Sequence, residues 1–223
     1  MSWGEVFKIN SNMKKPLNEQ LRDMKFQPIR VITSTGTYIP EKTGIYKIIC
    51  IGSGGDGAYA QTGSNLGSSG GGGGGVAIKV MKLTSSVSYS VTVSTTASFA
   101  YSGGAITATS GGAAFSGKSA GVGGTASGGD YNYVGEAGSS SSSFNTGVRA
   151  GSVGVVLTDL TRSHYRTNAL RNGTATTYLV CDGILNYGGG GTVLVDSYNS
   201  TYVANTVAPL PAAILIIPLE MEE

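Results

Sequence analysis

The stretch Gly70–Leu83 reads GGGGGGVAIKVMKL, six consecutive glycines followed directly by an eight-residue strand pattern. In VAIKVMKL apolar and polar side chains largely alternate with a period of two, which is typical of a half-buried strand. The six glycines could form a flexible linker. They could instead form an ordered polyproline II segment, with three residues per turn and no internal hydrogen bonds. Such segments can pack backbone against backbone, satisfying N–H and C=O groups between neighbours.

This combination of glycine cluster and strand recurs along the chain. Further clusters stand at 52–57, 103–104, 111–112, 123–124, 128–129 and 188–191. Because they alternate with strand patterns, the sequence favours ordered crossings over one long linker and predicts an all-β protein. The other predicted strands are Ile29–Thr33, Gly44–Ile51, Val87–Ser94, Val153–Leu157, Thr176–Val180, Ile184–Tyr187, Thr192–Asp196 and Ala212–Pro218. Asp182-Gly183 predicts a hairpin turn between Thr176–Val180 and Ile184–Tyr187.

Composition excludes several classes of protein. Of 223 residues 36 are glycine, yet hydrophobic residues reach 40% and the net charge is only +2, which argues against a disordered chain. The glycines lack the three-residue period of collagen. So small a net charge gives no electrostatic reason to expect nucleic acid or an anionic membrane as a partner. No apolar run approaches the roughly 18 residues that span a bilayer, and no secretory signal stands at the N-terminus.

The N-terminal residues differ from the rest of the chain. Residues 1–50 carry eight Lys/Arg and four Asp/Glu, whereas 83–148 contain only Lys118, Asp130 and Glu136. Apolar residues at helical spacing (Met13, Leu17, Leu21 and Met24) predict a short helix over about Lys15–Met24. We therefore expect an attachment segment over 1–28 and a glycine-rich β domain over 29–223.

Few residues suit catalysis. The single histidine, His164, stands beside Ser163 and near Asp159, but members of a catalytic triad converge from distant parts of a fold. No His, Cys or carboxylate group has metal-ligand spacing, so we expect no enzyme activity, metal or cofactor. Cys50 and Cys181 lie in apolar runs and are predicted to be buried, reduced thiols in preference to a disulfide or metal pair.

Binding residues are a better expectation. The segment Gly128–Gly147 places aromatic rings next to carboxylate and amide groups, a combination that suits sugar recognition because rings stack on sugar C–H faces. The candidate receptor-binding residues are Asp130, Tyr131, Asn132, Tyr133 and Phe144, with Tyr59 in a second segment. The alternative is that these rings fill a small core of the loop itself. The basic stretch of Arg162, Arg166 and Arg171 is interpreted as a solvated face or subunit contact.

Residues Thr33–Ser94 also resemble a known family. An entry motif at Thr33, Gly36, Thr37, Tyr38 and Pro40 precedes a strand ending in a glycine cluster, then the six glycines, and finally Tyr89, Val91 and Val93. This order resembles the glycine-rich domain of bacteriophage and prophage tail-fibre proteins. The resemblance implies a jelly-roll-like β-sandwich with polyglycine crossings, a homotrimer and a role in adsorption to the host. Ser85–Ser86 and Ser94 depart from it, because the family often has glycine there.

The expectation is therefore a tail-fibre or receptor-binding protein of a virion tail or phage-tail-like particle. The resemblance implies attachment of the N-terminus to a baseplate or preceding fibre and binding of host cell-surface carbohydrate through exposed loops. No nucleic acid partner and no membrane insertion are expected. One alternative is a purely structural fibre or baseplate component, and a less favoured one is an enzyme that degrades surface polysaccharide.

Overall fold

This computed structural model contains two antiparallel five-stranded sheets, a bundle of glycine-rich segments that lie between strands, and a set of hairpins. The structure describes residues 29–62, 65–115, 119–141, 148, 150–151, 153, 163–169, 175–181, 187–198 and 201–222. The predicted helix in 1–28 and most of the strand predicted at Val153–Leu157 lie outside these residues. The strands, in chain order, are β1 (Arg30–Ile32), β2 (Gly36–Tyr38), β3 (Gly44–Ile51), β4 (Ala58–Thr62), β5 (Asn65–Ser69), β6 (Val76–Leu83), β7 (Tyr89–Val93), β8 (Ala97–Tyr101), β9 (Gly104–Ala108), β10 (Ala126–Ser127), β11 (Tyr131–Tyr133), β12 (Ser140–Ser141), β13 (Ser163–Ala169), β14 (Ala175–Cys181), β15 (Thr192–Tyr198), β16 (Thr201–Val207) and β17 (Ala213–Met221).

Two five-stranded sheets pack into a sandwich. The first has the order β1-β17-β3-β6-β11 and the second β10-β9-β8-β7-β2. The period-two pattern of β7 appears directly as alternating buried and exposed residues, because one face of its sheet meets the core and the other meets solvent. The all-β prediction is confirmed for the described residues, and the strands predicted at 44–51 and 76–83 have those bounds.

The core between the sheets comes from strands far apart in sequence. Tyr46 and Ile48 of β3 and Ile214 of β17 meet Phe99 of β8 and Ile106 of β9 in one buried cluster. The rings of Tyr89 and Phe99 stack inside it with centroids 5.4 Å apart, an arrangement that stabilises beyond the area it buries. The Cys50 thiol is in this cluster, is not in a disulfide and is fully buried, which confirms the prediction for this cysteine.

The first sheet also buries part of its outer face. Ile49, Ile51 and Leu215 point away from the second sheet and are 0% exposed, in a cluster with Val153 and the partly buried Tyr187. Strands with both faces covered read as continuous apolar runs. That explains why IICI in β3 and AILII in β17 show no polar alternation.

A bundle of glycine-rich segments continues from the sandwich, with Gly70–Gly75 at its centre. Every N–H of this segment donates to a neighbouring backbone, and the acceptor segments repeat every three residues. Gly70 and Gly73 donate to segment 134–139, Gly71 and Gly74 to 187–191, and Gly72 and Gly75 to 109–114. This period is that of a helix with three residues per turn. The prediction of ordered tracts, as opposed to a linker, is confirmed.

The carbonyls of the same segment complete the ring of neighbours. They accept from Gly52 and Gly55, from Gly121 and Gly124, and from Gly151, so three more segments surround the centre. With backbone on all sides, little room remains for a side chain. A Cβ at Gly72 would lie 1.8 Å from the Val122 carbonyl oxygen, and one at Gly74 would lie 1.9 Å from that of Gly52. The central segment therefore consists of glycine alone.

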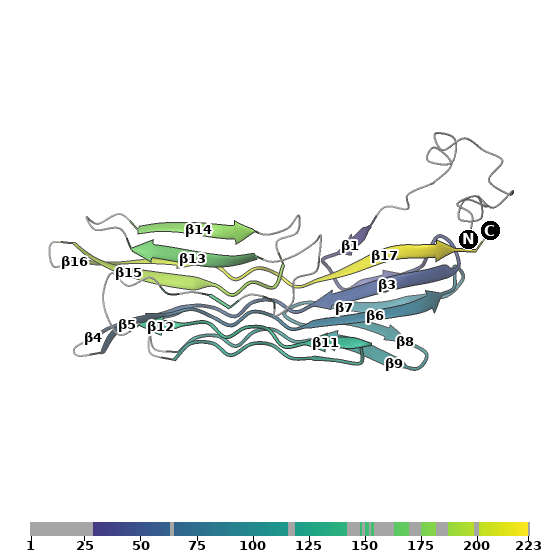
Figure 1. Ribbon diagram of the computed structural model, residues 1–223, viewed down its shortest axis with the longest axis horizontal. Helices are drawn as coiled ribbons and strands as arrows, with labels where there is room; N and C mark the ends of the chain where they lie inside the picture. Colours follow the sequence, from purple (N-terminus) through teal and green to yellow (C-terminus); the bar gives the residue numbers. More distant parts are fainter. Residues whose placement is uncertain are drawn as a thin grey trace, which may run out of the picture.

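Hairpins extend from the bundle at the end opposite the sandwich (Figure 1). β4 and β5 pair with each other, β12 joins β5, and β15 pairs with β16. The hairpin predicted around Asp182-Gly183 falls on residues 182–186, which lie outside the described residues, and β14 pairs with the upstream strand β13. Tyr187 precedes the glycine tract Gly188–Gly191, which bonds to the bundle.

Candidate functional site

The predicted binding segment 128–147 is not a single exposed loop. Gly128 makes a turn at φ +75°, residues 131–133 form edge strand β11 on β6, and 134–139 join the glycine bundle. Expecting one exposed loop was wrong, because backbone pairing on either side of Val134 divides the segment between sandwich and bundle. Phe144 lies outside the described residues.

Asp130 and Asn132 use their polar atoms within the protein. Asp130 accepts from the Val80 N–H at 2.8 Å and pairs with the Lys79 ammonium at 3.1 Å. These contacts, the Val80 N–H first, lower the pKa of Asp130, while the bond to Asp130 raises the pKa of Lys79. The Asn132 amide exchanges two hydrogen bonds with the backbone of Gly129. Both side chains hold the turn that leads into β11.

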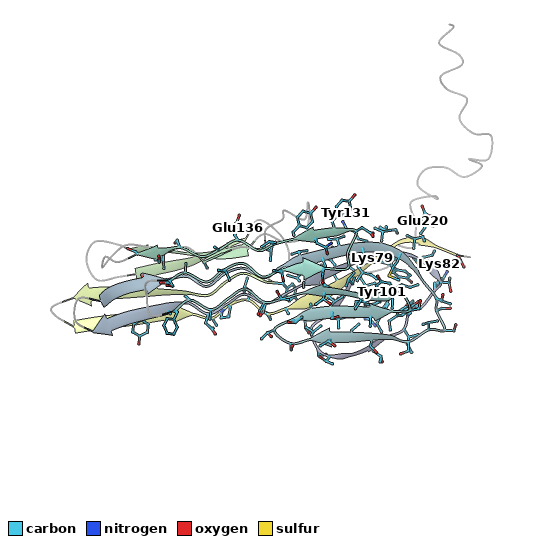
Figure 2. All side chains as sticks on the ribbon, turned by 90° about the horizontal axis from the view of Figure 1, so that it is seen from below. Lys79, Lys82, Tyr101, Tyr131, Glu136 and Glu220 are labelled. Atoms are coloured by element: carbon cyan, nitrogen blue, oxygen red, sulfur yellow. The ribbon has the colours of Figure 1, made fainter. Side chains whose placement is uncertain are left out.

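The two tyrosines of β11 face opposite sides of the strand. Tyr131 is 61% exposed, and Figure 2 shows its ring standing out from the sandwich. Tyr133 is partly buried against the cluster of Ile49 and Leu215. Alternation along a strand therefore divides the pair: Tyr131 is exposed, whereas Tyr133 packs against the outer face of the first sheet and not within a core of the loop itself.

Tyr59 lies at the other end of the molecule, next to an aromatic residue that the sequence analysis did not select. The Ser53 and Asp56 carbonyls accept from Gly111 and Ala114, so segments 52–57 and 109–114 run parallel and in register. The two segments therefore leave the bundle side by side. One leads to Tyr59, near the start of β4, and the other to Phe115. Tyr59 is 41% and Phe115 77% exposed.

A carboxylate is also exposed on one of these neighbouring segments. Asp56 is exposed on the same parallel segment, three residues before Tyr59. We call Asp56, Tyr59 and Phe115 the shoulder patch, because it lies where the bundle ends and the hairpins begin. Its aromatic and acidic side chains suit the stacking and hydroxyl bonding of a sugar. Phe115 stands alone among small residues in GGAAFSG, and that isolation was the only signal in the sequence.

The predicted site residues are thus not brought together. β11, with Tyr131, belongs to the sandwich, whereas β4, with Tyr59, lies at the hairpin end (Figure 1). Between them lies the length of the glycine bundle. A single ligand of monosaccharide size cannot contact both.

Cys50 is the one cysteine whose side chain the structure describes. Burial raises the pKa of the Cys50 thiol to about 12, so it is no nucleophile at neutral pH. Among the described residues, no three His, Cys, Asp or Glu side chains gather where a metal ion could bind. No helix in the same residues is long and apolar enough to cross a membrane.

Comparison with known proteins adds no assignment: no family model matches the chain, and no curated protein matches it.

Proposed function

We propose that the chain is a receptor-binding tail-fibre protein of a phage or phage-tail-like particle. The observation that supports this best is the separation of its two ends. β1 and β17 lie in the sandwich, where the Glu222 N–H bonds the Thr43 carbonyl at 2.9 Å, and the hairpins project from the far end of the bundle. A molecule attached at the sandwich presents its hairpins outward.

The glycine bundle suits such a spacer. Backbone hydrogen bonds in three directions fix Gly70–Gly75 to its neighbours, so the hairpins are held away from the attachment point without a flexible joint. In this proposal residues 1–28, with the predicted helix Lys15–Met24, contact the baseplate or preceding fibre. The proposal also includes a jelly-roll-like class for the sandwich and the association of three copies of the chain. A trimer that presents three weak sites gains avidity from multivalency.

The ligand in this proposal is a host cell-surface glycan. The shoulder patch is its first candidate site, because two exposed rings and a carboxylate lie at the outward-facing end. Tyr131, with the Lys79–Asp130 pair beside it, is the second candidate, at the sandwich. A structural fibre component without a receptor site is the alternative function.

The test compares adhesion of three purified proteins to bacterial cells and to their surface polysaccharide. The wild type is expected to adhere, and Tyr59→Ala combined with Phe115→Ala is expected to lower adhesion at least tenfold, because each stacked ring contributes about 1 kcal/mol or more. Tyr131→Ala tests the second candidate site: a tyrosine that is 61% exposed is removed at the opposite end, and if the shoulder patch is the binding site, its adhesion should equal that of the wild type.

Other outcomes of this experiment, together with light scattering and an assay for released reducing sugar, point to a different site or a different function. Loss of adhesion in Tyr131→Ala alone moves the site to the sandwich. A wild type that is trimeric by light scattering but adheres to nothing supports the structural role. Release of reducing sugar from the polysaccharide supports the enzyme.

A further inference from the structure

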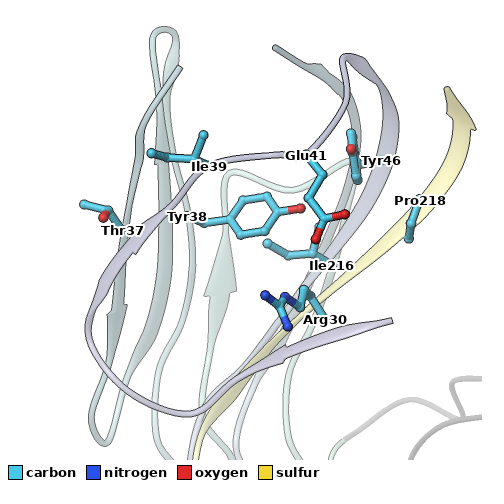
Figure 3. Close-up of a pocket in the computed structure, with 8 residues that line it drawn as sticks. All are labelled: Arg30, Thr37, Tyr38, Ile39, Glu41, Tyr46, Ile216 and Pro218. Carbon is cyan, nitrogen blue, oxygen red and sulfur yellow. The ribbon is translucent and has the colours of Figure 1, made fainter. Parts of the chain in front are cut away.

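A small pocket lies where the chain crosses from the first sheet to the second. It sits between β1, the start of β3 and the connection that follows β2, and has a volume of about 230 Å³. Figure 3 shows Arg30, Tyr38, Glu41, Tyr46, Ile216 and Pro218 around it. The pocket belongs to the sandwich and is separate from the shoulder patch.

The inner wall of the pocket is apolar and firmly held. Ile216 is 1% and Tyr46 2% exposed, and the Tyr46 hydroxyl donates to the Lys42 carbonyl at 2.7 Å. Burial and then the neighbouring Tyr46 raise the pKa of Tyr38 to about 12. Both phenols are therefore neutral hydrogen-bonding groups at physiological pH.

The rim carries one cation and one anion. Arg30 and Glu41 are exposed, and both act on the Tyr38 hydroxyl, with opposite electrostatic effects. They do not form an ion pair with each other or with any other described residue. Figure 3 shows the Glu41 carboxylate beside the Tyr38 hydroxyl, with Ile216 drawn between it and Arg30 in this view. Two opposite charges thus border one cavity without forming an ion pair with each other.

From this arrangement we infer that the pocket binds a small zwitterion, an α-amino acid with an apolar side chain. Its carboxylate pairs with the Arg30 guanidinium, its ammonium with the Glu41 carboxylate, and its side chain packs against Ile216 and Pro218. A ligand with only a negative charge would be repelled by Glu41, and a ligand with only a positive charge would be repelled by Arg30. The volume is below the roughly 300–1,000 Å³ of pockets for drug-sized ligands, which favours so small a molecule.

Calorimetry on the full-length protein with L-leucine tests this inference, together with two blocked analogues. N-acetyl-leucine lacks the ammonium and leucinamide lacks the carboxylate. L-leucine is expected to bind saturably, and each analogue to bind about tenfold more weakly or worse, because one charge-assisted contact is lost. Equal affinity for all three compounds, or no saturable heat with L-leucine, overturns the inference.

Two variants locate the binding. Arg30→Gln and Glu41→Gln each remove one rim charge and are expected to weaken L-leucine binding about tenfold. Lys47→Gln is the control, since it removes an equivalent charge from β3 outside the pocket and should bind as the wild type does. Near-UV circular dichroism verifies folding. Unchanged binding in both rim variants overturns the assignment, and none of these outcomes depends on adhesion to cells.

Discussion

Asp130 shows how a single side chain closes the edge of a sheet. β11 covers only Val76–Ile78 of β6, so the next N–H on the same edge of β6, that of Val80, has no strand to pair with among the described residues. The Asp130 carboxylate accepts from it, and Lys79 pairs with the same carboxylate. A charged, occupied edge of this kind resists pairing with another chain.

Asp130→Asn is expected to lower the melting temperature by a few degrees at pH 7. The folded-state pKa of Asp130 is lowered from 3.8, so its stabilisation is present above that pH and is lost as the pH falls through the folded pKa. The difference between variant and wild type should therefore vanish in acid. Melting curves from pH 7 to about pH 2 measure it.

Glu222→Gln provides the matched control for that experiment. Glu222 pairs with Lys82, and both side chains are more than half exposed. Exposed ion pairs of this kind contribute little to the free energy of unfolding, so the variant should have the same melting temperature as the wild type at every pH. A pH-independent loss in Asp130→Asn would show that the charge of Asp130 is not what stabilises the turn.

At the scale of elements, the central glycine segment is the part that tolerates least change. Gly72→Ala would place a Cβ 1.8 Å from a backbone oxygen that cannot move without breaking the Gly112–Val122 hydrogen bond. We expect a loss of about 3 kcal/mol or more, which corresponds to roughly 6–12 °C in melting temperature. Thermal and denaturant unfolding both measure it.

Gly36→Ala is the control for that substitution. A Cβ at Gly36 meets nothing within 4 Å, and replacing such a glycine restricts the unfolded chain. Its stability should equal or slightly exceed that of the wild type. Equal effects of the two substitutions would contradict the backbone-packed bundle.

The sequence predicted the positions of strands better than it predicted which strands and segments pair with one another. An apolar run located β3 and period-two patterning located β6, because their neighbours impose largely continuous burial on the first strand and alternating burial on part of the second. It missed β8 and β9, where small residues such as those of GAITA carry a weak hydrophobic signal. Six glycines indicated an ordered tract, but its neighbours come from distant parts of the chain, and no local pattern specifies them. For the same reason the predicted site was divided between two ends.

At the scale of the whole molecule, sandwich and bundle share their chains. β3 passes directly into segment 52–57, Gly70–Gly75 into β6, and the second sheet bonds to the bundle through Ser53 N–H and the Thr95 carbonyl at 2.9 Å. Neither part can lose its packing without releasing the ends of strands in the other. Cooperative units of this kind open together.

We therefore expect a single unfolding transition in which the amides of Gly70–Gly75 lose their protection from hydrogen exchange together with those of β3. Tyr46 and Tyr89 report the sandwich core by near-UV circular dichroism, and the glycine amides report the bundle. Gly72→Ala should lower the temperature of the near-UV circular dichroism transition and the temperature at which the glycine amides lose protection by the same amount, although the substitution lies outside the sandwich. If the glycine amides exchanged well below the tyrosine transition, the bundle would be a separate unit, and the rigid spacer that the proposed function requires would be lost.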